Sequence, residues 1–202
     1  MLAVFSNLDR SLFLVLNKAF RNSVLDWLLP FISTNQLVWL VPGVILAIYL
    51  AMGSARTRWA LAGIIMAAAL SDSLGAYVIK PLFQRPRPFS ELTGIFVYLQ
   101  GWVPVESIKA GPTLSFPSGH AASSTAAAVV LGYFFPKARL VLIFLVLVVC
   151  YSRIYMGLHY PGDILGGMVL GLACAGAFFL FRQGLTKAFP RLFRPLTPEG
   201  AK

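Results

Sequence analysis

Long apolar stretches that contain few charged residues dominate the chain from residue 37 onward. Most of them approach the roughly 20 residues that a helix needs to cross the hydrocarbon core of a bilayer. We expect five membrane-spanning helices here, at about residues 37–53, 59–80, 118–135, 139–157 and 162–181. This pattern predicts an all-α fold, a polytopic bundle of transmembrane helices.

The pattern is less regular before residue 37. Residues 9–20 alternate apolar and polar positions, which predicts an amphipathic helix. We expect residues 1–22 to lie in the membrane interface or to open a first span, because the apolar stretch 23–32 is too short to cross alone. With that first span, the chain forms a single domain, residues 1–202, with about six transmembrane helices.

The composition also indicates a membrane protein. Hydrophobic residues make up 58% of the chain and charged residues 12%, whereas soluble domains carry roughly 25% charged residues. The formal net charge of +10 would suggest a nucleic-acid partner in a soluble protein. Most basic residues here flank apolar stretches, where they fix topology and meet anionic lipid headgroups. We therefore expect the bilayer and its lipids as partners and no nucleic acid; the oligomeric state stays open.

Basic residues are concentrated in three segments that parity places on one side of the membrane. These are the connections after the second and fourth predicted spans and the tail, residues 182–202. Their basic residues are Arg56, Arg58, Lys137, Arg139, Arg182, Lys187, Arg191, Arg194 and Lys202. Cytoplasmic segments carry an excess of lysine and arginine, so we expect this side to be cytoplasmic and the long loop 81–117 to be extracytoplasmic.

Cations on the extracytoplasmic side therefore need a different explanation. They are Lys80, Arg85, Arg87, Lys109 and Arg153. Four of them fall in or beside three polar segments, residues 80–88, 117–120 and 152–163, which parity places at the same membrane face. The chain has two histidines, and both lie in these segments. We expect the three segments to form one pocket.

Three cations of this pocket point to an anionic ligand. Lys80, Arg87 and Arg153 lie where an unpaired charge is costly, so an anion should complete them. Arginine forks suit phosphate oxygens, and lysine adds a compact charge. Ser118 and Gly119 open a predicted helix, whose free N–H groups also favour an anion. Together these residues predict a phosphate-binding cage.

The histidines and an aspartate add the groups that phosphoryl transfer needs. Asp163 follows His159 by four residues, so its carboxylate can orient the imidazole and stabilise the cation that forms when the ring attacks. His120 remains as a general acid for the leaving oxygen. A nitrogen nucleophile, an acid and three cations make a complete phosphoryl-transfer site.

These motifs resemble, in order and spacing, the three signatures of the type 2 phosphatidic acid phosphatase (PAP2) superfamily. The matching segments are Lys80-x6-Arg87-Pro88, Pro117-Ser118-Gly119-His120 and Ser152-Arg153-x5-His159-x3-Asp163. The resemblance implies a PAP2/haloperoxidase-like core and dephosphorylation through a phosphohistidine on His159, without metal or other cofactor. It also implies that His120 protonates the leaving group and Asp163 orients His159. The residues implied to hold phosphate are Lys80, Arg87, Ser118, Gly119 and Arg153.

The Arg85-Pro-Arg87-Pro sequence and the short chain look most like bacterial undecaprenyl-diphosphate phosphatases of this superfamily. That resemblance implies a multi-pass protein of the bacterial inner membrane that hydrolyses undecaprenyl diphosphate on the periplasmic face. Related alternatives are phosphatases of phosphatidylglycerol phosphate, phosphatidic acid or lipid A, and a lipid phosphotransferase. A lipid or anion transporter is the non-enzyme alternative.

The sequence leaves two interpretations open for several residues. Two histidines and an aspartate could bind zinc, but three nearby cations would repel a metal ion, so we expect no metal. Arg85 either supports the phosphate site or anchors the chain at the interface. Asp72, inside the third predicted span, pairs with a polar group in the bundle or serves the site. Gly167 and Gly171 belong to a small-residue pattern that favours close helix packing.

Overall fold

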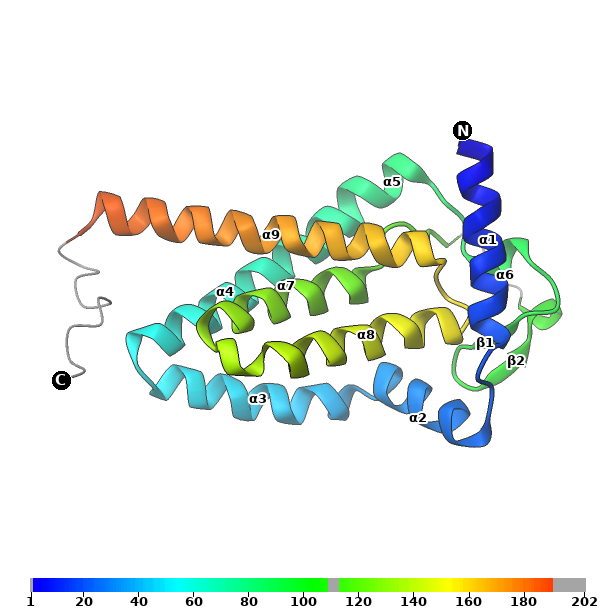
Figure 1. The fold of residues 1–202 in the computed structure, drawn as a ribbon, viewed down its shortest axis with the longest axis horizontal. Helices are drawn as coiled ribbons and strands as arrows, with labels where there is room; N and C mark the ends of the chain where they lie inside the picture. The colour runs from blue at the N-terminus through cyan, green and yellow to red at the C-terminus, as the bar shows by residue number, and fades with distance from the viewer. Residues whose placement is uncertain (1, 109–112, 191–202) are drawn as a thin grey trace.

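The computed structural model describes residues 2–108 and 113–190. Lys109 and the end of the predicted cytoplasmic tail, with Arg191, Arg194 and Lys202, lie outside the described residues. Figure 1 shows the long helices of the bundle, which run along the long axis of the molecule. They are α3 (Gln36–Met52), α4 (Ala55–Leu74), α7 (Gly119–Phe134), α8 (Arg139–Tyr155) and α9 (Pro161–Ala188). These five correspond to the five apolar stretches, and the all-α membrane bundle is confirmed.

Shorter elements connect the bundle helices or cover one end of the bundle. Helix α4 continues through a π-helical segment (Gly75–Ile79) into α5 (Lys80–Phe83). Helices α1 (Leu2–Lys18) and α2 (Ser23–Thr34) precede the bundle. The loop after α5 contains α6 (Pro88–Glu91), β1 (Phe96–Tyr98), β2 (Trp102–Pro104) and a 3₁₀ turn (Val105–Ser107). Another 3₁₀ turn (Pro136–Ala138) precedes α8. Strands β1 and β2 pair antiparallel, with Val97 opposite Val103.

The number of helices that could cross a membrane is smaller than the predicted six. Among the described residues, three helical stretches are long and apolar enough: Ala55–Phe83, Pro136–Tyr155 and Pro161–Ala188. Helices α2 and α3 would add a fourth if they form one span, bent by 74°. Helix α7 has 16 residues, fewer than the roughly 20 that a straight span needs. Helix α1 lies across the end of the bundle in Figure 1 and does not run along it.

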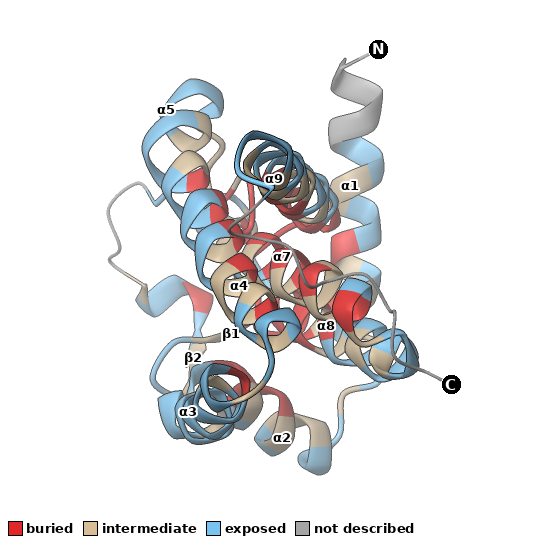
Figure 2. Cartoon of the chain, turned by 90° about the vertical axis from the view of Figure 1, so that its left-hand side faces the viewer, coloured by how far each residue is buried: buried red, intermediate tan, exposed pale blue. Residues whose placement is uncertain are grey.

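Small residues let α7 pack closely in the centre of the bundle, against α4 and α9. Ala122 and Ala126 of α7 are completely buried. Gly171 of α9 faces α7 so closely that a methyl group there would meet the carbonyl oxygen of Ala122 and the side chain of Thr125. Figure 2 shows buried residues where these helices meet and exposed residues on their outer sides. Many outer residues are large and apolar, such as Leu140 at 81% exposure, as expected for a surface in contact with lipid.

Arginines satisfy the carbonyl groups at the C-terminal end of α7. Arg56 donates a hydrogen bond to the carbonyl oxygen of Phe134, and Arg139 donates one to that of Gly132. Cations at a helix C-terminus are stabilising, because the free carbonyl groups carry partial negative charge. Two of the predicted topology-setting residues therefore also hold helix ends together.

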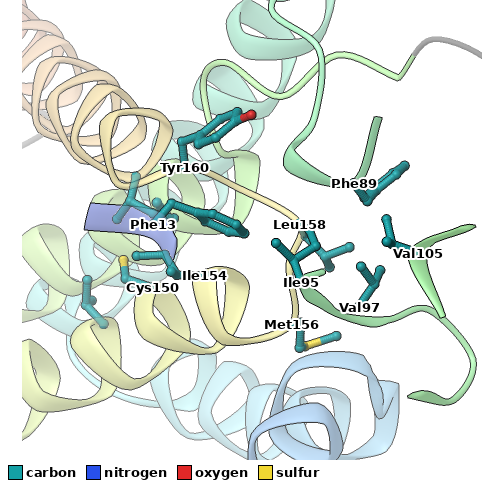
Figure 3. Close-up of a cluster of buried hydrophobic side chains, with 13 residues drawn as sticks. Phe13, Phe89, Ile95, Val97, Val105, Cys150, Ile154, Met156, Leu158 and Tyr160 are labelled. Atoms are coloured by element: carbon teal, nitrogen blue, oxygen red, sulfur yellow. The ribbon is translucent and has the colours of Figure 1, made fainter. Parts of the chain in front are cut away.

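A cluster of buried apolar side chains lies at the end of the bundle that is opposite the C-terminal end of α7. Figure 3 shows it between α1, the end of α8 and the loop that carries β1. Phe13 of α1 packs edge-to-face against Tyr160, with ring centres 5.3 Å apart. Val97 of β1 is completely buried in the same cluster. The described part of the loop 81–117 therefore folds onto this end of the bundle, where the three polar motifs also lie.

The close contact of α9 with α7 gives a test by substitution. We expect Gly171→Ala to destabilise the protein by about 1–3 kcal/mol, because the added methyl group overpacks the helix interface. A lower thermal unfolding midpoint in detergent micelles would show this. Gly176→Ala is the matched control on the same helix, because nothing lies within 4 Å of its added methyl group. Equal midpoints for the two variants would contradict the close packing.

Candidate active site

Backbone hydrogen bonds join the three motifs at one end of the bundle. The N–H of Ser118, just before α7, donates to the carbonyl oxygen of Asp163 in α9 at 3.0 Å. The N–H of Ser115 donates to the carbonyl oxygen of Arg85 at 2.8 Å. His159 lies in the connection from α8 to α9. Segments up to about 80 residues apart in the sequence thus meet in one place, as parity predicted.

His159 is buried beside Asp163. Its Nδ1 lies 3.6 Å from Oδ2 of Asp163, slightly beyond hydrogen-bond distance. Burial lowers the pKa of His159 to about 4, and the carboxylate of Asp163 opposes this shift only in part. The imidazole is therefore neutral at pH 7 and keeps a lone pair for attack. Gly157, with φ of +75° and the backbone of Phe96 against it, makes the tight turn that leads into this loop.

The carboxylate of Asp163 is completely buried and held on both oxygens. Oδ2 accepts a hydrogen bond from the backbone N–H of Tyr160 at 2.8 Å and so caps the start of α9. Oδ1 accepts a hydrogen bond from Nη1 of Arg85 at 2.9 Å. Negative charge at a helix N-terminus is stabilising. The aspartate is thereby fixed in the position from which it faces His159.

Several polar atoms of the site are buried without a partner. Within the described part of the chain, seven buried side-chain nitrogen or oxygen atoms lack a hydrogen bond. Four belong to predicted site residues, namely Arg87 Nε, Ser118 Oγ, Arg153 Nε and His159 Nδ1. An unsatisfied buried donor costs roughly 1–3 kcal/mol. Nδ1 of His159 faces Asp163, but the other three atoms come from three motifs, which indicates that a ligand with several acceptor oxygens completes the site.

Arg153 has a hydrogen-bond partner that the sequence did not indicate. Its side chain is buried in α8, and Nη1 donates a hydrogen bond to Oγ of Ser33 at 2.7 Å. Ser33 lies in α2 and is also buried. A single serine near the end of an apolar stretch carries no distinctive sequence signal, so this contact could be found only in the structure.

Lys80, Arg87 and His120 complete the charge distribution of the site. Lys80 is partly buried at the start of α5 and interacts electrostatically with Arg87 and Asp163. Burial lowers the pKa of Arg87. His120, in the first turn of α7, interacts electrostatically with Arg153, His159, Arg87 and Lys80. His120 and His159 each interact electrostatically with both Arg87 and Arg153, so the two histidines and these cations form one group.

His120 lies on the open side of the site. It is exposed and lines a cavity of about 590 Å³ together with residues of the α2–α3 bend, Ser33, Thr34, Asn35, Gln36 and Leu40. Ser33 also binds Arg153, so the cavity adjoins the buried cations. A group leaving the phosphate toward this cavity would pass His120.

Gly119, the other predicted phosphate contact of this motif, faces Asp72 across the start of α7. A methyl group at Gly119 would lie 3.4 Å from Oδ1 of Asp72. Asp72 interacts electrostatically with Lys80. The aspartate thus lies beside the start of α7 and near a site cation.

Arg85 binds two carboxylates. Nη1 binds Asp163, and Nη2 donates to Oδ2 of Asp9 in α1 at 2.6 Å. With both terminal nitrogens on carboxylates, the guanidinium supports Asp163 and is not directed at a phosphate. Asp9 was not among the predicted site residues; the only signal was an acid in the amphipathic helix.

No group of three or more histidine, cysteine, aspartate or glutamate side chains comes together as a metal site among residues 2–108 and 113–190. The donors nearest the candidate nucleophile are one carboxylate and the second imidazole, with the cations Arg87 and Arg153 beside them. That charge distribution favours an anion.

Comparisons with known proteins agree with the motifs. The sequence profile of the PAP2 superfamily matches residues 56–187. The chain is 29% identical to a lipid A 4'-phosphatase of Bacteroides thetaiotaomicron over 92% of this chain and 82% of that protein. It is 31% identical to an undecaprenyl-diphosphatase of Bacillus subtilis over 79% of this chain and 76% of that protein. The crystal structure of LpxE from Aquifex aeolicus superposes with a TM-score of 0.64 at 25% identity, covering 84% of this chain and 93% of that one. The resemblance carried by the three motifs is therefore confirmed, and the chain belongs to the PAP2 superfamily.

Proposed function

We propose that the protein is a metal-independent lipid phosphatase that works through a phosphohistidine on His159. The observation that carries the proposal is that Arg87, Ser118 and Arg153, one from each motif, have buried polar side-chain atoms without a partner near His159. A phosphate group presents several acceptor oxygens and up to two negative charges, which suits these donors. Lys80 and the N–H groups at the start of α7, at Gly119, complete the cage.

The reaction then takes two steps. Nδ1 of His159 faces Asp163, so Nε2 is the nitrogen that attacks phosphorus; the N–P bond forms as the P–O bond to the lipid breaks. His120 donates a proton to the departing oxygen. A water molecule next gives its proton to His120 and attacks the phosphohistidine, which breaks the N–P bond and releases inorganic phosphate. The cations stabilise negative charge on the phosphoryl oxygens in both steps.

We further propose that the site faces the extracytoplasmic side of a bacterial inner membrane. The connections at the opposite end of the bundle contain Arg56, Arg58, Lys137 and Arg139, and an excess of such residues is typical of the cytoplasmic side. The substrate headgroup would reach the site from the outer leaflet while its hydrocarbon chain stays in lipid. Phe96, Tyr98 and Trp102 of the loop 81–117 are the apolar contacts proposed for that substrate, whereas Phe89 of the same loop is buried in the cluster of Figure 3.

Undecaprenyl diphosphate is the substrate that we propose, with undecaprenyl phosphate and inorganic phosphate as products. The likeness to an undecaprenyl-diphosphatase over 79% of the chain supports this. The likeness to a lipid A 4'-phosphatase over 92% of the chain favours a second candidate, a phosphate carried on a lipid-linked sugar. Both substrates present a terminal phosphate monoester or diphosphate to the same cage.

Anion binding by the phosphate cage can be tested without measuring catalysis. We expect orthovanadate, a phosphate analogue, to raise the thermal unfolding midpoint in detergent by roughly 5–10 °C at a hundred times its dissociation constant, because it binds only the folded site. Arg153→Gln should lose most of this shift. Arg182→Gln is the matched control, because Arg182 Nε is also buried without a partner but lies near the opposite end of the bundle, beside Trp59 and Phe134. An equal shift in both variants would show that vanadate binds elsewhere.

The covalent intermediate gives the second test. We expect His159→Ala to lower phosphate release by roughly a thousandfold or more, as loss of a nucleophile does. Rapid quenching at alkaline pH should trap an acid-labile phosphoenzyme in the wild-type protein and none in His159→Ala. Excess chelator should leave the wild-type rate unchanged. Wild-type turnover by His159→Ala would rule out the mechanism, and lipid or anion transport that persists in this variant would favour a transporter.

The substrate proposal predicts a ranking among lipids. We expect purified protein to release phosphate from undecaprenyl diphosphate with a higher kcat/KM than from lipid A, phosphatidylglycerol phosphate or phosphatidic acid. Phosphate release measured across this panel in mixed micelles tests the ranking. Preference for lipid A would select the second candidate. Transfer of phosphate to an added lipid alcohol in place of water would identify a phosphotransferase.

A further inference from the structure

Helix α1 packs against the loop that carries His159 and against the segments that flank this loop. The side-chain amide of Asn17 donates hydrogen bonds to the carbonyl oxygens of Tyr155 and Phe96, both at 3.0 Å. It also accepts the N–H of Phe96 at 2.9 Å. Asn17 is completely buried. One side chain of α1 therefore ties the end of α8 to strand β1, just before the loop with His159 begins.

The same helix also fixes the middle of this loop. Phe13 packs on the ring of Tyr160. Arg10 donates a hydrogen bond to Glu91 at 2.9 Å, and the same carboxylate oxygen accepts the hydroxyl group of Tyr160 at 2.9 Å. Tyr160 follows His159 directly in the sequence. The residue next to the candidate nucleophile is thus held on its ring and on its hydroxyl group.

Asp9 extends these contacts to the catalytic pair. Its Oδ1 accepts the backbone N–H of Gly162 at 2.7 Å, and its Oδ2 accepts Nη2 of Arg85 at 2.6 Å. The guanidinium of Arg85 lies 4.1 Å from the ring centre of Tyr160 and binds Asp163 with its other terminal nitrogen. A planar guanidinium can bridge two carboxylates in a fixed geometry, which a lysine cannot do.

We propose that Arg85 is a positioning residue for the pair His159–Asp163 and that Asp9 of α1 holds it in place. The role rests on the proposed phosphohistidine mechanism. Arg85 fixes one oxygen of Asp163 and thereby directs the other oxygen at His159. The chain of contacts runs from α1 through Asp9, Arg85 and Asp163 to the nucleophile. The N-terminal helix thus contributes to catalysis without contact with the substrate.

The experiment is a double-mutant cycle on Asp9 and Arg85. Asp9→Asn keeps an oxygen for the N–H of Gly162 but places a donor against Arg85, so it removes only the contact with the guanidinium. We expect kcat to fall roughly 10-fold in Asp9→Asn and roughly 100-fold in Arg85→Gln, with KM little changed, because misplacement of a catalytic group by about 1 Å can cost a factor of this size. The double variant should match Arg85→Gln alone, because Asp9 acts through Arg85.

Two controls separate this role from others. Glu106→Gln makes the same carboxylate-to-amide change at an exposed residue and should keep the wild-type rate. The thermal shift with orthovanadate should persist in Arg85→Gln, because the phosphate cage stays intact. A persistent shift also shows that the variant is folded.

Three outcomes would overturn the proposal. They are a wild-type rate in Asp9→Asn, a loss of the vanadate shift with raised KM in Arg85→Gln, and additive losses in the double variant. The second outcome would place Arg85 in the phosphate cage. His159→Ala is measured in the same series to distinguish the two proposals. If His159→Ala is inactive while Arg85→Gln and Asp9→Asn are fully active, the positioning role is wrong and the phosphatase mechanism stands.

Discussion

The buried carboxylate of Asp163 is the point at which the parts of this protein are joined. One oxygen caps α9 through the N–H of Tyr160, and the other binds Arg85. The carbonyl group of the same residue accepts the N–H of Ser118 at the start of α7. An isolated carboxylate is costly to bury, so it persists only with partners that hold its charge. The partners of the carboxylate come from the first and third motifs, and the second motif is joined through the backbone carbonyl group of Asp163. Asp163 thereby sets the relative position of α7, α9 and the loop after α5.

The charge around Asp163 divides into two groups with different tasks. Arg85 is neutralised by two carboxylates, Asp9 and Asp163. Arg87 and Arg153 keep buried nitrogen atoms without partners, beside a neutral His159. The first group is complete in the free protein and gives rigidity, whereas the second is completed only by an anion. A fixed framework beside unsatisfied donors is the arrangement that electrostatic stabilisation of a phosphoryl group needs.

The sequence predicted the bundle and the meeting of the motifs, because both follow from local patterns. Apolar stretches give helices, and parity brings their ends to one face. It did not reveal Ser33 and Asp9, which reach Arg153 and Arg85 from 120 and 76 residues away and have no motif of their own. Among the described residues, three helical stretches, or four with the bent pair α2 and α3, meet the length and composition of a span, compared with about six predicted. The sequence did not show that α7 would have only 16 residues or that α1 would lie across the bundle.

For helix α1, the amphipathic pattern alone does not determine which side faces the protein and which side faces lipid. In a soluble protein its apolar side would face the core, but here Leu8 and Val15 are more than 60% exposed, while Asn17 is completely buried. The side of α1 that faces the loop with His159 therefore carries Asn17 together with Phe13, whereas Leu8 and Val15 lie on the exposed side and are free to contact lipid. In an interfacial position, one of the two that the sequence leaves open for residues 1–22, the bilayer would supply the apolar environment for one side of the helix. The position of Asp9, and through it that of Arg85 and Asp163, then depends on the membrane as well as on the fold.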